Sequence, residues 1–136
     1  MAERPKVGLG VIVVRGNKVL VGRRLAAGGK GTWCFPGGHL EFNEELEDGA
    51  RREVKEEASI GIKNVKVVAV TNDINKEEGT HYITIFFRAE YDSGVVKANE
   101  PDKIADLKWV EWDKLPRSLF LPTINLLKQG YNPFKN

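Results

Sequence analysis

The chain has 136 residues, of which 41% are hydrophobic and 29% charged, and its formal net charge is +2. This length and composition indicate one globular domain, residues 1–136, with a sizeable core. The small net charge argues against a protein that coats nucleic acid or binds a membrane surface. A single cysteine, Cys34, excludes an internal disulfide, and without a signal peptide or long apolar run we expect a cytoplasmic protein.

The start of the chain predicts a β-hairpin. Residues 6–14 are a β-branched run, residues 15–17 a turn, and residues 18–24 (KVLVGRR) alternate in polarity. Two arginines, Arg23 and Arg24, end this second strand and point to opposite faces of it. One of them is placed to bind an anion by paired hydrogen bonds, and two solvated surface arginines are the alternative.

Two glycine-rich stretches follow the hairpin. Residues 26–31 (AAGGKG) lack the GK[ST] ending of a P-loop, so we expect a mobile rim and not a phosphate cradle. Residues 36–38 (PGG) predict a glycine turn where the backbone can approach a ligand closely. Trp33 and Phe35 lie directly before this turn. Aromatic residues so placed mostly belong to a core, although one of them could stack against a planar ring.

A helix is predicted from residue 44 or 45 to about residue 58. No proline interrupts this stretch, and Leu46, Ala50 and Val54 recur four residues apart, which marks an apolar stripe. Acidic residues crowd the first turn, where the helix dipole favours negative charge. We therefore expect one face of this helix to pack against a core.

The far end of this helix carries three glutamates on one face. Glu53, Glu56 and Glu57 stand at i, i+3 and i+4, and carboxylates so close repel one another unless positive charge intervenes. Arg52 supplies one charge, and a hard divalent cation is the obvious further counterweight. Mg²⁺ favours a few carboxylates together with substrate phosphates. The alternative is a solvated face whose carboxylates pair with basic side chains of the same helix.

The second half of the chain alternates strands with polar connections. Residues 62–71 predict a strand and residues 72–79 an exposed connection. Residues 81–91 (HYITIFFRAEY) are the most strongly β stretch, so we expect them centrally in a sheet. Residues 92–102 form a polar loop, and residues 106–111 are a further short strand.

A second helix is predicted over residues 121–128, with Pro122 tolerated in its first turn and Gly130 at its end. The tail, residues 131–135, carries two aromatic side chains, so we expect it to pack down. The order of elements indicates an α/β domain with a mixed sheet and helices on its faces.

The first helix and the glycine before it resemble the signature of the Nudix hydrolases. The positions that match are Gly38, Glu44, Arg52, Glu53, Val54, Glu56, Glu57 and Ile60. The one departure is Ser59, where the family carries a glycine that ends the helix, and we expect Gly61 to take over that turn. The resemblance covers nearly the whole chain and implies the Nudix fold, an α/β/α sandwich.

Other segments resemble one subgroup, the small MutT-like nucleoside triphosphate diphosphatases that act on purine nucleotides, oxidised ones included. Those segments are PGGHLEF (36–42), HYITIF (81–86), NEPDK (99–103), WVEWDKLP (109–116) and QGYNPF (129–134). The proline that ADP-ribose hydrolases of the family carry beyond the signature is missing. The resemblance implies hydrolysis of a nucleoside triphosphate, such as dGTP or 8-oxo-dGTP, to monophosphate and diphosphate by a homodimer that uses Mg²⁺ or Mn²⁺.

The resemblance also implies roles for the acidic residues. The carbonyl of Gly37 and the carboxylates of Glu53 and Glu57 resemble the metal ligands, with Glu56 as a further ligand or a base. Metal ions neutralise phosphate oxygens and lower the pKa of a bound water, while a carboxylate free of metal takes its proton. We expect Glu53 or Glu56 to take that proton, with Glu100 as an outside candidate.

By similarity, Glu44 orients Arg52, and Arg24 contacts the phosphates. The expected base pocket is lined by Phe35, His39, Thr84, Phe120, Leu121, Pro122 and Thr123. Close relatives have a tryptophan where Leu121 stands, so base stacking is weaker here.

Two other functions remain open. Some members of the subgroup accept an isoprenyl diphosphate, and Phe120 and Leu121 suit a hydrocarbon chain; another nucleoside diphosphate derivative is a further substrate of this kind. A Nudix-fold module that binds a nucleotide without cutting it is the other alternative. Such a module is expected to lack signature carboxylates, and all of them are present in this chain.

Overall fold

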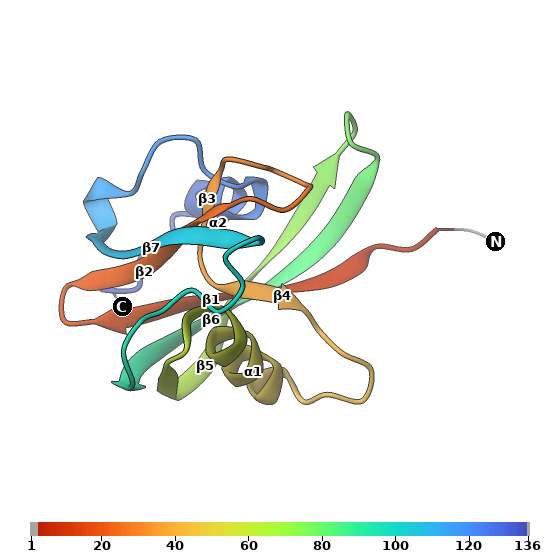
Figure 1. The fold of residues 1–136 in the computed structure, drawn as a ribbon. Coiled ribbons are helices and arrows are strands. Elements are labelled where there is room, and N and C mark those ends of the chain that lie inside the picture. The colour runs from red at the N-terminus through yellow and green to blue at the C-terminus, as the bar shows by residue number, and fades with distance from the viewer. Residues whose placement is uncertain (1–2, 136) are drawn as a thin grey trace.

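In the computed structural model, which describes residues 3–135, strand β1 (Lys6–Arg15) runs through the middle of the molecule (Figure 1). Its β-branched run is buried on both faces because alternate side chains enter two different cores. Val11 and Val13 belong to one hydrophobic cluster. Ile12 and Val14 belong to the other. A strand buried in this way must lie between two covering layers.

The sheet around β1 is mixed. Strand β2 (Lys18–Arg24) pairs antiparallel with β1 across a two-residue turn, which confirms the predicted hairpin. Strand β6 (Thr80–Ser93) lies parallel to β1 and antiparallel to β5 (Gly61–Asn75), so it is central as predicted. The remaining strands are β3 (Trp33–Cys34), β4 (Gly37–His39) and β7 (Ile104–Glu111). The strand order is β3-β2-β1-β6-β5, with β4 beside β1 and β7 beside β2.

Strand β5 is longer than its sequence suggests. The predicted exposed connection at residues 72–79 is wrong in its first half, because the ladder with β6 continues through Asp73 opposite Tyr82 to Asn75 opposite Thr80. The side chain of Asp73 is buried, so the polar alternation marks a half-buried strand. Strand β7 likewise begins two residues before the predicted start, at Ile104.

The predicted glycine turn at residues 36–38 is also wrong. Gly37 and Gly38 belong to β4, where they lie opposite Gly10 and Leu9 of β1. Neither has a positive φ. A Cβ atom at Gly37 would overlap the backbone carbonyl of Leu9, so the missing side chain allows two strands to approach closely.

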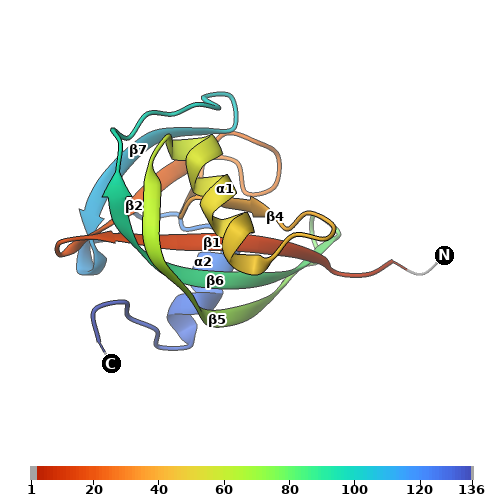
Figure 2. The same ribbon diagram turned by 90° about the horizontal axis from the view of Figure 1, so that it is seen from below.

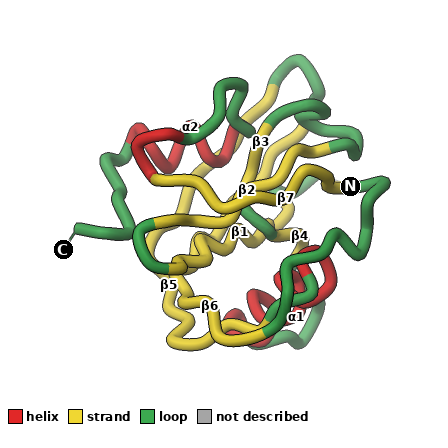
Figure 3. Tube along the Cα trace, turned by 60° about the vertical axis from the view of Figure 1, so that its left-hand side comes forward, coloured by secondary structure: helices red, strands yellow, loops and turns green. Residues whose placement is uncertain are grey.

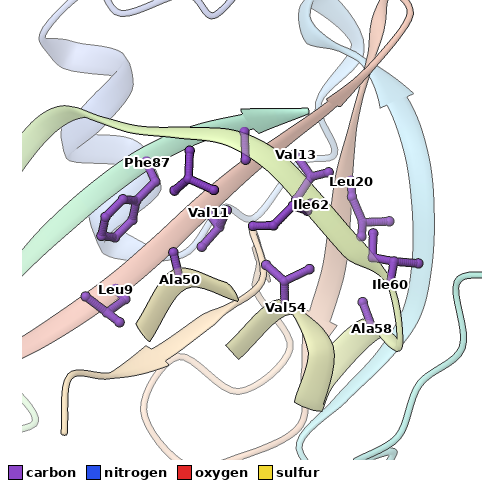
Figure 4. Close-up of a cluster of buried hydrophobic side chains, with 12 residues drawn as sticks. Leu9, Val11, Val13, Leu20, Ala50, Val54, Ala58, Ile60, Ile62 and Phe87 are labelled. Carbon is purple, nitrogen blue, oxygen red and sulfur yellow. The ribbon is translucent and has the colours of Figure 1, made fainter. Parts of the chain in front are cut away.

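The two helices cover opposite faces of the sheet (Figures 2 and 3). Helix α1 (Leu46–Ala58) begins after Glu45, and its apolar stripe enters the first cluster, where Ala50 and Val54 face Val11 (Figure 4). Helix α2 (Leu121–Lys128) has the predicted bounds and packs Leu126 into the second cluster. The α/β/α sandwich is therefore confirmed. No helix within residues 3–135 is both long and apolar enough to cross a membrane.

Three further segments complete the fold. Ser59 itself adopts the left-handed conformation that ends α1, with φ 66° and its N–H donated to Lys55, so the prediction that Gly61 takes over is wrong. The short 3₁₀ helix η1 (Trp112–Lys114) precedes α2. The tail packs down as predicted, because the ring of Tyr131 meets that of Trp112 edge-on.

Candidate active site

Arg52 is the centre of the polar cluster on α1. Its Nε lies 2.7 Å from Glu44 Oε2 and its Nη2 lies 2.9 Å from Glu44 Oε1, a bidentate pair. Its Nη1 lies 2.6 Å from Glu53 Oε1 and 3.4 Å from Glu56 Oε2, and Nη2 also donates to the carbonyl of His39. Hydrogen bonding to Arg52 lowers the pKa of Glu44 to about 2. Arg52 thus stays charged and fixes the neighbouring carboxylates.

Glu57 lies at the other edge of this cluster. Its Oε1 accepts the backbone N–H of Gly37 at 2.8 Å. Burial raises the pKa of Glu57 to about 7, and the negative charges of Glu53 and Glu100 act in the same direction. Burial also raises the pKa of Glu53. Burial therefore disfavours the ionised form of both carboxylates, and further positive charge nearby would favour it.

Gly38 makes room for Glu53. A Cβ atom at Gly38 would overlap the carboxyl group of Glu53, whose residue is only 8% exposed. The backbone of β4 therefore lies directly against the acidic face of α1, and the signature glycine is required by packing.

These residues fit a divalent cation. Carboxylate and carbonyl oxygens are the ligands that Mg²⁺ prefers, and the raised pKa values of Glu53 and Glu57 mark a site short of positive charge. Glu53, Glu56, Glu57 and the carbonyl of Gly37 could hold such an ion. Within residues 3–135, no three acidic, histidine or cysteine side chains already converge on one point, and Arg52 lies between Glu53 and Glu56.

A cavity of about 1020 Å³ opens beside this cluster. The three glutamates of α1, together with Glu100 and Lys103 of the late loop, line one part of it. The other part is lined by the end of β5, the start of β6 and the start of α2, namely by Asp73, Asn75, Thr80, Tyr82, Thr84, Phe120, Leu121 and Pro122. One space therefore joins the acidic face of α1 to side chains of β5, β6 and the start of α2.

Arg24 and His39 line this cavity as well. The Nε of Arg24 donates to the carbonyl of Gly28 at 2.7 Å, and its guanidinium lies 4.2 Å from the centre of the Phe120 ring. His39 stacks on Tyr82 with 5.5 Å between ring centroids, and burial lowers its pKa. Arg24 therefore holds the glycine-rich rim against the residue before α2.

The other expected pocket residues divide between cavity and core. Thr84 lines the cavity from β6, and Phe120 and Leu121 line it from the start of α2. Phe35 touches the cavity but is 4% exposed, with its ring stacked on Trp112 in the second cluster. Thr123 is buried and lies outside the residues that line the cavity.

Some cavity residues were not expected from the sequence. Asp73, Tyr82 and Lys103 all line it. The predicted connection at residues 72–79 leaves Asp73 outside the expected site, although the alternation of Thr71, Asp73 and Asn75 is the signal of a half-buried strand.

The chain matches the NUDIX domain family model over residues 4–129. It is 29% identical over 116 residues to an ADP-ribose pyrophosphatase of Methanocaldococcus jannaschii, covering 85% of this chain and 68% of that protein. It is 32% identical over 114 residues to the NAD-capped RNA hydrolase NudC of Yersinia enterocolitica, covering 82% of this chain but only 41% of NudC.

Among solved structures, a MutT NUDIX hydrolase from Burkholderia pseudomallei superimposes with a TM-score of 0.85 at 32% identity, covering 92% of this chain and 98% of that one. The family model, the superposition and the signature residues on and around α1, which depart from the family pattern only at Ser59, agree with one another. The chain therefore belongs to the Nudix hydrolase family.

Proposed function

We propose that this Nudix hydrolase converts a nucleoside triphosphate, and a purine nucleotide in particular, to a nucleoside monophosphate and diphosphate with Mg²⁺. One observation carries the proposal: a single cavity joins the carboxylates of α1 to a region walled by Thr84 and Phe120. The acidic region suits a metal-bound phosphate chain. The other region offers an aromatic ring and polar atoms to a nucleobase.

Several charged residues of the cavity have roles in the proposed reaction. Bound Mg²⁺ would neutralise phosphate oxygens and acidify a water. Glu53 is held by Arg52 at 2.6 Å, whereas Glu56 is more exposed and 3.4 Å from it, so Glu56 is freer to take a proton from water. Arg24 and Lys103 line the same cavity and offer positive charge to the phosphates.

A second candidate substrate is a nucleoside diphosphate derivative such as ADP-ribose. The relative from Methanocaldococcus jannaschii is named an ADP-ribose pyrophosphatase, and a cavity of about 1020 Å³ lies at the upper end of the volumes of ligand pockets. The missing proline beyond the signature favours the triphosphate. An isoprenyl diphosphate suits Phe120 and Leu121, but its hydrocarbon chain would leave the nearby Asp73 without a polar partner from the ligand.

The test is hydrolysis with Mg²⁺ or Mn²⁺ of GTP, ATP, 8-oxo-dGTP, CTP, ADP-ribose and geranyl diphosphate, with separate detection of diphosphate and monophosphate. We expect diphosphate release from purine triphosphates, reduced by at least about 100-fold in Glu57→Gln. The matched control is Glu47→Gln, an exposed glutamate in the first turn of α1, which should leave the rate unchanged.

If only ADP-ribose or only geranyl diphosphate is hydrolysed, that compound and not a triphosphate is the substrate. If the protein binds GMP but hydrolyses no compound of the panel, it is a nucleotide-binding module and the proposal fails.

A further inference from the structure

Asp73 is a buried carboxylate of β5 whose oxygens accept hydrogen bonds from side chains of β5, β6 and α2. It is 3% exposed and lines the cavity. Its Oδ2 accepts the hydroxyl groups of Thr71 at 3.1 Å and Thr84 at 2.5 Å. Its Oδ1 accepts the side-chain amide of Asn125 from α2 at 2.9 Å. Three elements, β5, β6 and α2, therefore converge on this one group.

The direction of these hydrogen bonds decides whether Asp73 and Thr84 can donate hydrogen bonds to a ligand or only accept them. Two donors occupy Oδ2, whereas Oδ1 accepts one bond and keeps a free lone pair. The proton of Thr84 points at Asp73, so the oxygen of Thr84, which also lines the cavity, has only lone pairs left for a ligand. Asp73 and Thr84 together form a wall that accepts hydrogen bonds and donates none.

Among residues 3–135, no basic side chain forms an ion pair with this carboxylate, since the ion pairs there all involve other acidic residues. Burying a carboxylate is costly unless hydrogen-bond donors compensate, and three neutral donors do so only in part. A ligand that brings further N–H groups to this wall would therefore bind there in preference to one that brings lone pairs.

We propose that Asp73 is a specificity-determining residue that selects a base with two adjacent N–H donors, the N1–H and 2-amino groups of guanine. Adenine presents a lone pair at N1 on the corresponding edge, which the acceptor wall repels. The inference rests on the proposed function for the nature of the ligand. The inference goes beyond the proposed function because it names the edge of the base that is recognised and the residue that recognises this edge.

The experiment measures two quantities on the wild type, on Asp73→Asn and on the matched control Asp106→Asn. Asp106 is an exposed aspartate that pairs with Arg23 and lies outside the cavity lining. The first quantity is the dissociation constant of GMP, IMP and AMP by calorimetry, which requires no turnover. The second is kcat/KM for GTP, ITP and ATP with Mg²⁺.

In the wild type we expect guanine to be preferred to adenine by about 10- to 100-fold in both quantities, with hypoxanthine, which lacks the 2-amino group, in between. Asp73→Asn places a donor in the wall, so the preference should fall at least about 10-fold. Asp106→Asn should keep it.

The outcomes separate this inference from the proposed function. Equal binding of GMP, IMP and AMP by the wild type overturns the inference without any variant, even if Asp73→Asn fails to fold. An unchanged guanine preference in folded Asp73→Asn overturns it as well, while triphosphate hydrolysis still stands. A guanine preference in binding that Asp73→Asn loses supports the inference even if the wild type hydrolyses no triphosphate.

Discussion

Glu57 in the last turn of α1 accepts a hydrogen bond from the backbone N–H of Gly37 in β4 at 2.8 Å. This bond joins the acidic helix to the strand whose carbonyl is a candidate metal ligand. The hydrogen bond favours the ionised carboxylate of Glu57, whereas burial of the side chain disfavours it, and the effect of burial is the larger of the two.

That opposition predicts a pH-dependent stability. The pKa of Glu57 is raised from 4.5 to about 7 in the folded protein, so between these pH values the native state holds a proton that the unfolded chain has released. The free energy of unfolding of the metal-free protein should therefore fall as pH rises from about 4.5 to 7. Glu57→Gln keeps an acceptor oxygen without charge, and should be more stable at pH 7.5 by about 1–3 kcal/mol.

Urea unfolding in EDTA from pH 5 to 8 measures this effect, and Glu56→Gln, an exposed glutamate in the same turn, is the control. Mg²⁺ should stabilise the wild type more than Glu57→Gln, because an ion that binds the folded state stabilises it and the variant lacks the carboxylate of Glu57, a candidate ligand. If the free energy of unfolding changes with pH in the same way for the wild type and Glu57→Gln, ionisation of Glu57 does not destabilise the folded protein.

Glu44 predicts the opposite pH dependence. Its pKa is lowered to about 2 by hydrogen bonds from Arg52, so its stabilising effect is present above 4.5 and is lost as pH falls toward 2. Glu44→Gln should be less stable than the wild type at pH 7, and the difference should vanish in acid. Because Arg52 would lose its bidentate partner, kcat should also fall by about 10- to 100-fold. An equal difference at pH 7 and pH 2.5 would contradict this assignment.

Alanine substitutions at the two glycines of β4 should have different effects, one on stability and the other on activity. Gly37→Ala forces a methyl group against the backbone of Leu9, so we expect a loss of more than about 2 kcal/mol of stability. Gly38→Ala meets the side chain of Glu53, which can move aside, so the protein should fold but lose activity. Gly8→Ala, whose new methyl group would have only ordinary contacts, is the control for stability. Thermal unfolding and GTP hydrolysis measure the two effects, and equal stability of the first two variants would refute the distinction.

Ser59 ends α1 in a conformation that glycine adopts more easily. Its Oγ donates to the carbonyl of Lys97 at 3.0 Å, and this bond ties the helix end to the late loop. Ser59→Ala keeps the left-handed strain and loses the bond, so it should be less stable by about 0.5–1.5 kcal/mol. Ser59→Gly loses the same bond but relieves the strain, so it should lie close to the wild type. If urea unfolding shows Ser59→Ala to be as stable as Ser59→Gly, the left-handed conformation of this residue carries no strain, and if Ser59→Ala equals the wild type, the hydrogen bond to Lys97 contributes nothing.

Local sequence patterns predicted much of the fold. The spacing of Ala50 and Val54 predicted α1, and the prolines and glycine around residues 121–130 predicted α2 with its observed bounds. The β-branched run of β1 predicted the first strand of a hairpin, and the aromatic run of β6 predicted a central strand. These predictions succeed because each element's periodicity records which of its faces is buried.

The errors fall where a distant partner decides the conformation. Three of the residues 72–75 are polar, yet this segment extends β5 because β6 continues alongside it. Gly37 and Gly38 are a strand and not a turn because β1 lies within reach of their backbone. Ser59 carries a positive φ, and its hydroxyl bonds to Lys97, a partner 38 residues away. None of these partners is visible in the local sequence.

The acidic signature on α1 was determined by the sequence alone, because fixed spacing on a helix places the three glutamates on one face. The cavity was decided only by the tertiary structure. It joins side chains from β5, β6, α2 and the late loop to that face, and it places Asp73 and Thr84 in one wall while leaving Thr123 outside. Such convergence depends on strand register and helix packing, and these follow from the burial of both cores together and not from any one segment.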